Sequence, residues 1–203
     1  QDQLGTNVLN NDKVLENLGL FPSVNLVYSV TENQNIRLSY GKTIARPSFK
    51  ELSYAEIFDP ITGRTFVGGL FRDADNATGV VYWDGELTST NIHNLDFRWE
   101  IFPSKGRTVS ISAFYKKFIN PIEIIQYATQ PGAFQPRNVG DGQVLGGEFE
   151  IRENLSWISK KTEAFDFVLN VTVVDSRIEL SKTEYDSRVA NARTGQVIET
   201  FRK

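Results

Sequence analysis

The stretch NIHNLDFRWEIF, residues Asn91–Phe102, decides the fold class, because its side chains alternate in polarity along its length. Its apolar positions are Leu95, Phe97, Trp99 and Ile101, and the positions between them carry Asn94, Asp96, Arg98 and Glu100. A period of two residues is typical of a β-strand with one apolar and one polar face.

The same alternation occurs in five further segments, residues 24–30, 35–44, 109–116, 145–152 and 165–173. No helical pattern of comparable strength competes with them. The sequence therefore predicts an all-β protein built from about six antiparallel strands.

Composition excludes several classes of protein. The chain has 203 residues, a net charge of -3 and no cysteine. This charge gives no electrostatic reason to expect a nucleic-acid partner, and cysteine chemistry or ligation is impossible. No apolar run approaches the ~18 residues of a spanning helix, so any contact with a lipid bilayer must be made by strands.

The connections between the strands alternate in length. Short turns are expected at Thr31–Gln34, Pro103–Gly106 and about 156–161, and long loops at about 47–87, 120–141 and 180–203. In an up-and-down meander, all short turns then lie at one end and all long loops at the other, as in transmembrane β-barrels. A soluble β-sandwich shows the same alternation of side chains, but it rarely contains an irregular connection as long as the first loop.

Aromatic and charged residues agree with a barrel. Phe21, Trp99, Phe102 and Trp157 are expected near the short turns, where aromatic side chains mark the membrane interface. The polar faces carry charged side chains that suit a water-filled lumen better than a dry core. These predicted lumen-facing residues are Asp96, Arg98, Glu100, Glu148, Glu150 and Arg152.

Several segments, taken in order, resemble the barrel of TonB-dependent outer-membrane receptors. They are the runs from Leu20 to Leu26, Asn35 to Tyr40 and Ala45 to Leu52, the strand NIHNLDFRWEIF, the run FYKKFINPIE from Phe114 to Glu123, and the run from Asn138 to Glu150. The resemblance covers about residues 20–177. The order and spacing of these segments carry the similarity more than any single motif does.

The resemblance implies a barrel of about 22 strands closed by an N-terminal plug, so this chain is expected to be the middle-to-late part of a larger barrel. The plug is expected to be absent from residues 1–203. Such receptors take up siderophores, cobalamin or oligosaccharides with energy from TonB, which contacts an N-terminal region, in the outer membrane of Gram-negative bacteria. The sequence leaves open whether a surface lipoprotein covers the loops, and it indicates no cofactor.

Ligand contacts are expected in the first long loop, because loops on a rigid scaffold carry function. The candidates are Asp59, Arg64, Arg72, Tyr82 and Trp83. Asp73 and Asp75 faintly resemble a calcium loop, but the pattern lacks the glycine and glutamate that such a loop requires, so a solvated acidic turn is the default interpretation.

No catalytic site is expected. His93 is the only histidine, and a strand would place it and Asp96 on opposite faces. Three hypotheses follow: part of a TonB-dependent transporter, a stand-alone small barrel acting as an adhesin or pore, and a soluble β-sandwich that binds carbohydrate.

Overall fold

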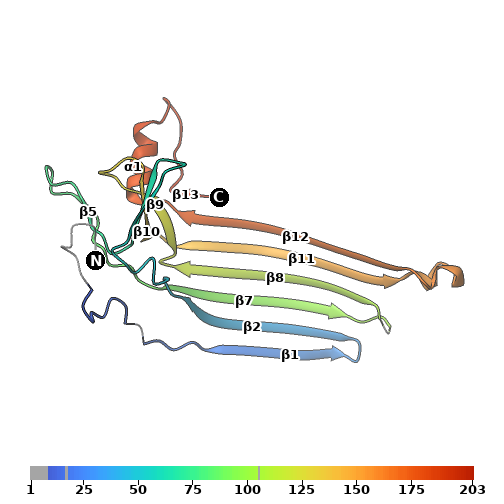
Figure 1. Ribbon diagram of the computed structural model, residues 1–203. Coiled ribbons are helices and arrows are strands. Elements are labelled where there is room, and N and C mark those ends of the chain that lie inside the picture. The colour runs from blue at the N-terminus through green and yellow to red at the C-terminus, as the bar shows by residue number, and fades with distance from the viewer. Residues whose placement is uncertain (1–8, 17, 105) are drawn as a thin grey trace.

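The fold was taken from a computed structural model, which describes residues 9–16, 18–104 and 106–203. Six long antiparallel strands form one sheet (Figure 1). They are β1 (Ser23–Thr31), β2 (Gln34–Ala45), β7 (Thr90–Ile101), β8 (Thr108–Ile119), β11 (Gly142–Asn154) and β12 (Asp166–Glu179). Each pairs with the next in this order, and the short β13 (Phe201–Arg202) pairs with β12. The prediction of an all-β chain with about six long antiparallel strands is confirmed.

The short connections lie at one end of the sheet and the long ones at the other (Figure 1). Strands β1 and β2 are joined by two residues, Glu32 and Asn33. The connection from β11 to β12 is longer than expected and holds two short 3-10 helices, Leu155–Trp157 and Lys160–Thr162. Lys105, within the predicted turn Pro103–Gly106, lies outside the described residues.

The long connections contain regular structure. Residues 46–89 include β3 (Glu56–Asp59), β4 (Arg64–Val67), β5 (Asp73–Ala74) and β6 (Val81–Trp83), and residues 120–141 include β9 (Ile122–Gln126) and β10 (Ala133–Asn138). The third connection holds α1 (Lys182–Ala190), which Ser181 caps by accepting a hydrogen bond from the Glu184 amide. The expectation of an irregular first connection was therefore wrong.

The location of the buried apolar residues separates the sheet from these connections. Among the described residues, the buried apolar side chains are Val67, Leu87, Ala133 and Val139, and all four lie in the long connections. The apolar face of the sheet is uncovered instead. Phe97 is 41% exposed and Val173 is 71% exposed. A sheet of this kind needs an apolar environment outside it rather than a second packed layer.

One aromatic residue, Phe21, lies at the end of the sheet opposite to the end where it was expected. Ser23 pairs with Gly41 at the end of the sheet that carries the long connections. Phe21 precedes Ser23, so it lies beside the long loops and not beside the short turns. Among the described residues, no helix is long and apolar enough to cross a membrane.

Candidate functional site

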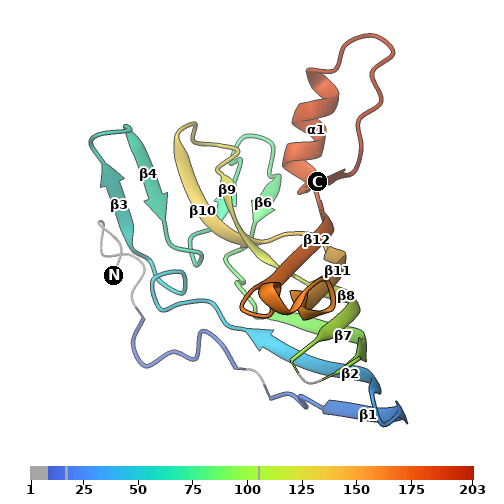
Figure 2. The same cartoon turned by 90° about the vertical axis from the view of Figure 1, so that its right-hand side faces the viewer.

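Two long connections, residues 46–89 and 120–141, together form what we call the loop unit. Strand β10 pairs in parallel with β4, with Thr65 opposite Ala133 and Phe66 opposite Phe134. The resulting four-stranded sheet has the order β3-β4-β10-β9. Figure 2 shows these strands and β6 standing together, with α1 beside them. Neither connection is therefore an independent flexible loop.

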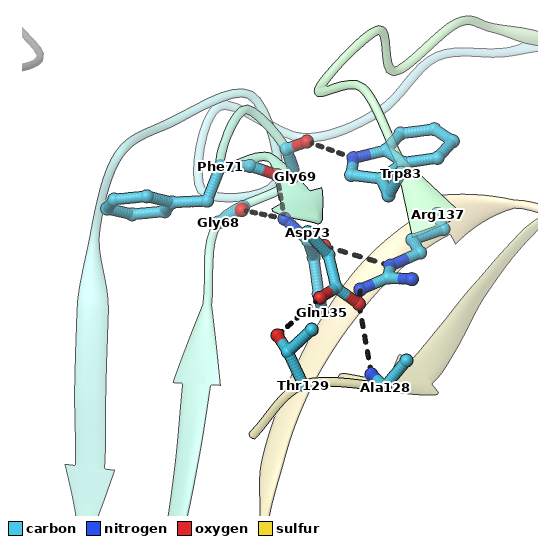
Figure 3. A network of polar contacts seen from close by, with 9 residues as sticks. All are labelled: Gly68, Gly69, Phe71, Asp73, Trp83, Ala128, Thr129, Gln135 and Arg137. Atoms are coloured by element: carbon cyan, nitrogen blue, oxygen red, sulfur yellow. Dashed lines mark hydrogen bonds and ion pairs between the residues drawn. The ribbon is translucent and has the colours of Figure 1, made fainter. Parts of the chain in front are cut away.

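A buried ion pair joins the two connections (Figure 3). Arg137 donates from Nη2 to Asp73 Oδ2 at 2.6 Å, and the two side chains are 5% and 0% exposed. The same carboxylate accepts hydrogen bonds from the Thr129 hydroxyl at 2.6 Å and from the Ala128 amide at 3.0 Å. A buried charge is tolerated when it is paired and its remaining hydrogen-bonding capacity is filled, and both conditions hold here.

This environment shifts two pKa values. Burial by itself raises the pKa of the Asp73 carboxyl, but the hydrogen bonds from Thr129, Arg137 and Ala128 outweigh it and hold the pKa below its usual value. Burial also raises the pKa of Tyr127 to about 12. The Arg137 guanidinium lies 5.0 Å from the centre of the Tyr127 ring. The loop unit is thus built around an ionised carboxylate and a neutral phenol.

Backbone carbonyls of the first connection are held by the same cluster. Gln135, fully buried, donates from Nε2 to the carbonyls of Gly68 at 2.8 Å and Phe71 at 2.7 Å. The Trp83 indole nitrogen donates to the Gly69 carbonyl at 2.7 Å. Gly68 is required at its position, because a Cβ there would lie 2.0 Å from the Ser53 carbonyl oxygen.

The predicted ligand residues fall into two groups. Asp59 and Arg64 face each other at the end of the β3–β4 hairpin. The Asp59 carboxylate accepts from the Thr62 hydroxyl at 2.6 Å and the Ile61 amide at 3.0 Å, so it stabilises its own turn. Arg64 lies over the Phe134 ring at 5.3 Å. Both residues therefore have local structural contacts.

The second group lies on and beside β6. Tyr82 and Trp83 line a cavity of about 240 Å³ between β6, β10 and the start of α1. Asn138 and Lys182 line it as well, and sequence reasoning missed both. Arg72, exposed, lies in the segment just before β5 and next to buried Asp73.

A larger cavity of about 470 Å³ lies where β8, β9, β11, β12 and β13 meet. Its lining is mainly apolar, with Phe118, Ile122 and Val144, and it also includes Glu123 and Arg202. Arg202 pairs with Glu123 and so joins the third connection to the loop unit. The run FYKKFINPIE carried Glu123, but nothing local in the sequence indicates its partner 79 residues away.

The two aspartates considered for calcium have protein partners. Asp73 is buried in the ion pair with Arg137, and Asp75 accepts hydrogen bonds from the Ala77 amide at 2.8 Å and the Thr78 hydroxyl at 2.8 Å. Within residues 9–16, 18–104 and 106–203, no group of three or more acidic or histidine side chains is placed to hold a metal ion.

The polar face of the sheet carries a series of linked ion pairs, which we call the ion chain. Glu100 accepts from Arg37 at 2.7 Å and from Arg98 at 2.9 Å. Arg98 also reaches Glu150 at 2.9 Å across β8, where small Ser110 lies between Glu100 and Glu150 in the register. These contacts join β2, β7 and β11 through side chains that share one face.

Residues 1–197 match the family model described as TonB dependent receptor-like, beta-barrel. This chain belongs to the TonB-dependent receptor family. No curated protein sequence matches it.

Two solved structures show the same fold as this receptor chain. A mutant of the ferric enterobactin receptor PfeA from Pseudomonas aeruginosa is 15% identical, with a TM-score of 0.51, over 80% of this chain and 25% of that one. The siderophore receptor PirA from Pseudomonas aeruginosa is 14% identical, with a TM-score of 0.51, over 81% of this chain and 31% of that one. The chain thus spans about a quarter to a third of the structures it matches.

The family places the two faces of the receptor sheet. The apolar face is the outer wall of a transmembrane barrel and the polar face lines its interior. Of the predicted lumen residues, Arg98, Glu100 and Glu150 form the ion chain. Asp96 is exposed, Glu148 is half-buried, and Arg152 is exposed near the short turns. His93 lies on the opposite face from Asp96, hydrogen-bonded through Nδ1 to the Tyr40 hydroxyl at 2.9 Å.

Proposed function

We propose that this receptor is an active transporter of the outer membrane of a Gram-negative bacterium. It imports a scarce ligand, namely a siderophore, cobalamin or an oligosaccharide, with energy supplied through TonB. The observation that carries this proposal is the asymmetry of the sheet. An ordered loop unit with cavities stands at one end, short turns occupy the other, and the apolar face between them is exposed.

The asymmetry also gives an orientation. The loop unit faces the outside of the cell, where ligand arrives, and the short turns face the periplasm. The cavity beside Tyr82 and the larger cavity beside Arg202 are then the places where this chain contacts ligand. Both offer aromatic or apolar side chains together with a few polar groups, the usual composition of a small-molecule site.

The proposed partners follow from the same orientation. TonB is a partner on the periplasmic side, and lipid surrounds the apolar face. A lipoprotein over the loop unit is a further candidate partner. We propose a receptor and transporter rather than an enzyme, since among the described residues His93 has the Tyr40 hydroxyl, and no carboxylate, as its hydrogen-bond partner.

The test is uptake by the complete receptor. It is produced in a strain that lacks its own receptors for the test ligands, with and without a functional tonB gene. Accumulation of labelled ferric siderophores, cobalamin and oligosaccharides is measured, with siderophores first because two structural neighbours are siderophore receptors. The proposal expects TonB-dependent accumulation of one ligand class.

Two outcomes contradict the proposal. Accumulation that persists without TonB identifies a passive pore. Alternatively, a barrel that shows a heat-dependent shift in electrophoresis, and is therefore assembled, accumulates none of the ligands.

A further inference from the structure

The inner face of the sheet changes in character along the strands. Its half nearest the short turns carries the ion chain. In the half nearest the long connections, the inward-facing positions of β8, β11 and β12 are mainly apolar or glycine, with Lys116 and Ser176 as polar exceptions. In register, the apolar residues are Phe114 and Val174, then Val144, then Phe118 and Ile178. On these three strands the lumen wall is therefore apolar beside the long connections and charged farther from them.

A cavity of about 470 Å³ lies against this apolar wall. Phe118, Val144 and Ile178 form its floor, one from each of three adjacent strands. Gly142 lies between Phe118 and Ile178 in the register. A Cβ at Gly142 would lie 3.6 Å from the Phe118 side chain and 3.7 Å from that of Ile178, so its absence deepens the floor. The floor is thus a hollow in the lumen wall, made by apolar side chains around a glycine.

The other side of the cavity is made by the long connections. Ile122 begins β9, Pro121 precedes it, and Arg202 belongs to β13. The cavity therefore lies between the barrel wall and two ordered connections, at the end of the sheet where the proposed function places the entry of ligand. Its volume is within the range of about 300–1,000 Å³ that is usual for small-molecule sites.

The charged residues of the lining give no strong preference for an ionic ligand. Arg202 pairs with Glu123, and Glu184 lies 3.8 Å from the Arg202 Nε atom. Arg177 alternates with the floor residues along β12, so its side chain projects from the outer face of the sheet. Lys203 is exposed to solvent. The surface that the cavity offers to a ligand is therefore mainly apolar.

We propose that this cavity binds an uncharged apolar group of the transported ligand, either an aromatic ring or an alkyl chain. The ligand is thus an amphipathic small molecule and not a plain oligosaccharide. The inference rests on the proposed function for the side from which ligand enters, and it narrows the ligand classes named there.

The composition of the floor is the physical reason for this choice. Moving an apolar group from water into the hollow is favourable in proportion to the area that it buries. A sugar ring in the same place would bring hydroxyl groups against Phe118, Val144 and Ile178. Ser176 is the only polar residue among the inward-facing ones that line the described cavity, so most of these hydroxyls would lose their hydrogen bonds to water without replacement.

The test compares two glucosides that differ only in their apolar group, 2-naphthyl β-D-glucoside and methyl β-D-glucoside. Binding to the complete receptor in lipid nanodiscs is measured by equilibrium dialysis, and empty nanodiscs provide the background. Val144→Asn places an amide in the floor. The matched control, Val174→Asn, makes the same change on the inner face one row closer to the short turns, outside the lining of the cavity. We expect the wild type and the control to prefer the naphthyl glucoside by roughly tenfold and Val144→Asn to lose most of this preference.

A second pair of variants tests the opposite side of the cavity. Ile122→Asn changes the lining residue on β9. Ile124→Asn changes the next residue on the same face of that strand, which is 55% exposed and lies outside the lining of this cavity. We expect Ile122→Asn, and not Ile124→Asn, to lower the preference for the naphthyl glucoside. The heat-dependent shift in electrophoresis shows which variants are assembled, and the pair on β9 decides if Val144→Asn is not.

Three results would overturn the inference. The first is equal affinity of the wild type for the two glucosides, and the second is an equal loss of preference in each variant and its control. The third is uptake of an oligosaccharide without any apolar group as the transported ligand, which would leave the proposed function intact. Conversely, a naphthyl preference that depends on Val144 and Ile122, without TonB-dependent uptake of any ligand, counts against the proposed function and supports the assignment of the cavity.

Discussion

Arg137 and Asp73 are 64 residues apart in the sequence, and their side chains form a buried ion pair at 2.6 Å that holds two long connections together. The pair lies outside the strand pattern that defines the barrel. It makes the loop unit a rigid support for the cavities beside it, as a preorganised binding site requires.

Removing one partner should loosen the loop unit without unfolding the sheet. Asp73→Leu leaves the Arg137 charge buried and unpaired, which costs about 3–5 kcal/mol. The double variant Asp73→Leu, Arg137→Met should recover most of that loss, because an apolar pair of similar volume needs no desolvated charge. Limited proteolysis of the loop unit measures the effect, with half-buried Asp75→Asn, which removes no ion pair, as control. Equal protection in the single and double variants would refute the coupling.

Acid should release the same unit. The pKa of Asp73 is lowered in the folded state, so its contribution is fully present above the unfolded pKa of about 3.9 and is lost as pH falls toward the folded pKa. Fluorescence of Trp83 in a Trp99→Phe, Trp157→Phe background should therefore change below about pH 4. The double variant Asp73→Leu, Arg137→Met has no such titrating group, and an identical acid transition in it would assign the change to another residue.

Two adjacent glycines on β11 should respond differently to alanine. A Cβ at Gly146 would lie 2.3 Å from the Phe114 ring, whereas at Gly147 the nearest atom would be 3.6 Å away. Gly146→Ala should cost about 1–3 kcal/mol through overpacking, and Gly147→Ala much less. The temperature of the heat-dependent band shift of the complete receptor measures this. Adding Phe114→Ala should reduce the cost at Gly146, and no reduction would place the strain elsewhere.

Two substitutions on the inner face of β7 test how much the ion chain stabilises the sheet. Glu100→Gln replaces a carboxylate that accepts from Arg37 and Arg98 and should cost about 1.5–3 kcal/mol, the range for hydrogen bonds to charged groups, with partial exposure of the arginines favouring the lower end. Asp96→Asn, on the same strand and face, has no ion-pair partner among the described residues and should be nearly neutral. Urea unfolding in detergent compares them, and equal losses would argue against the chain.

The long strands were predictable because each carries a period of two that depends only on its own residues. The loop unit was not. The parallel pairing of β4 with β10 joins distant segments, and Asp73 looked like part of a solvated turn because its partner Arg137 lies in another connection. Phe21 was assigned to the wrong end even though the sequence order excluded that end. The first strand runs toward the short turn Thr31–Gln34, so a residue that precedes the strand lies at the other end, as the pairing of Ser23 with Gly41 shows.

Tyr82 is a better residue than Trp83 for testing ligand contact at the cavity beside β6. Trp83 donates its indole N–H to the Gly69 carbonyl, so its loss would disturb the loop unit itself. Tyr82 is 38% exposed at the same cavity, and Tyr82→Ala should weaken ligand binding roughly tenfold, equivalent to about 1.4 kcal/mol of aromatic contact. Ligand affinity of the complete receptor is compared with that of Phe58→Ala, an exposed aromatic on the β3–β4 hairpin. If Phe58→Ala alone weakened binding, the ligand would contact the hairpin that carries Asp59 and Arg64 rather than the cavity beside β6.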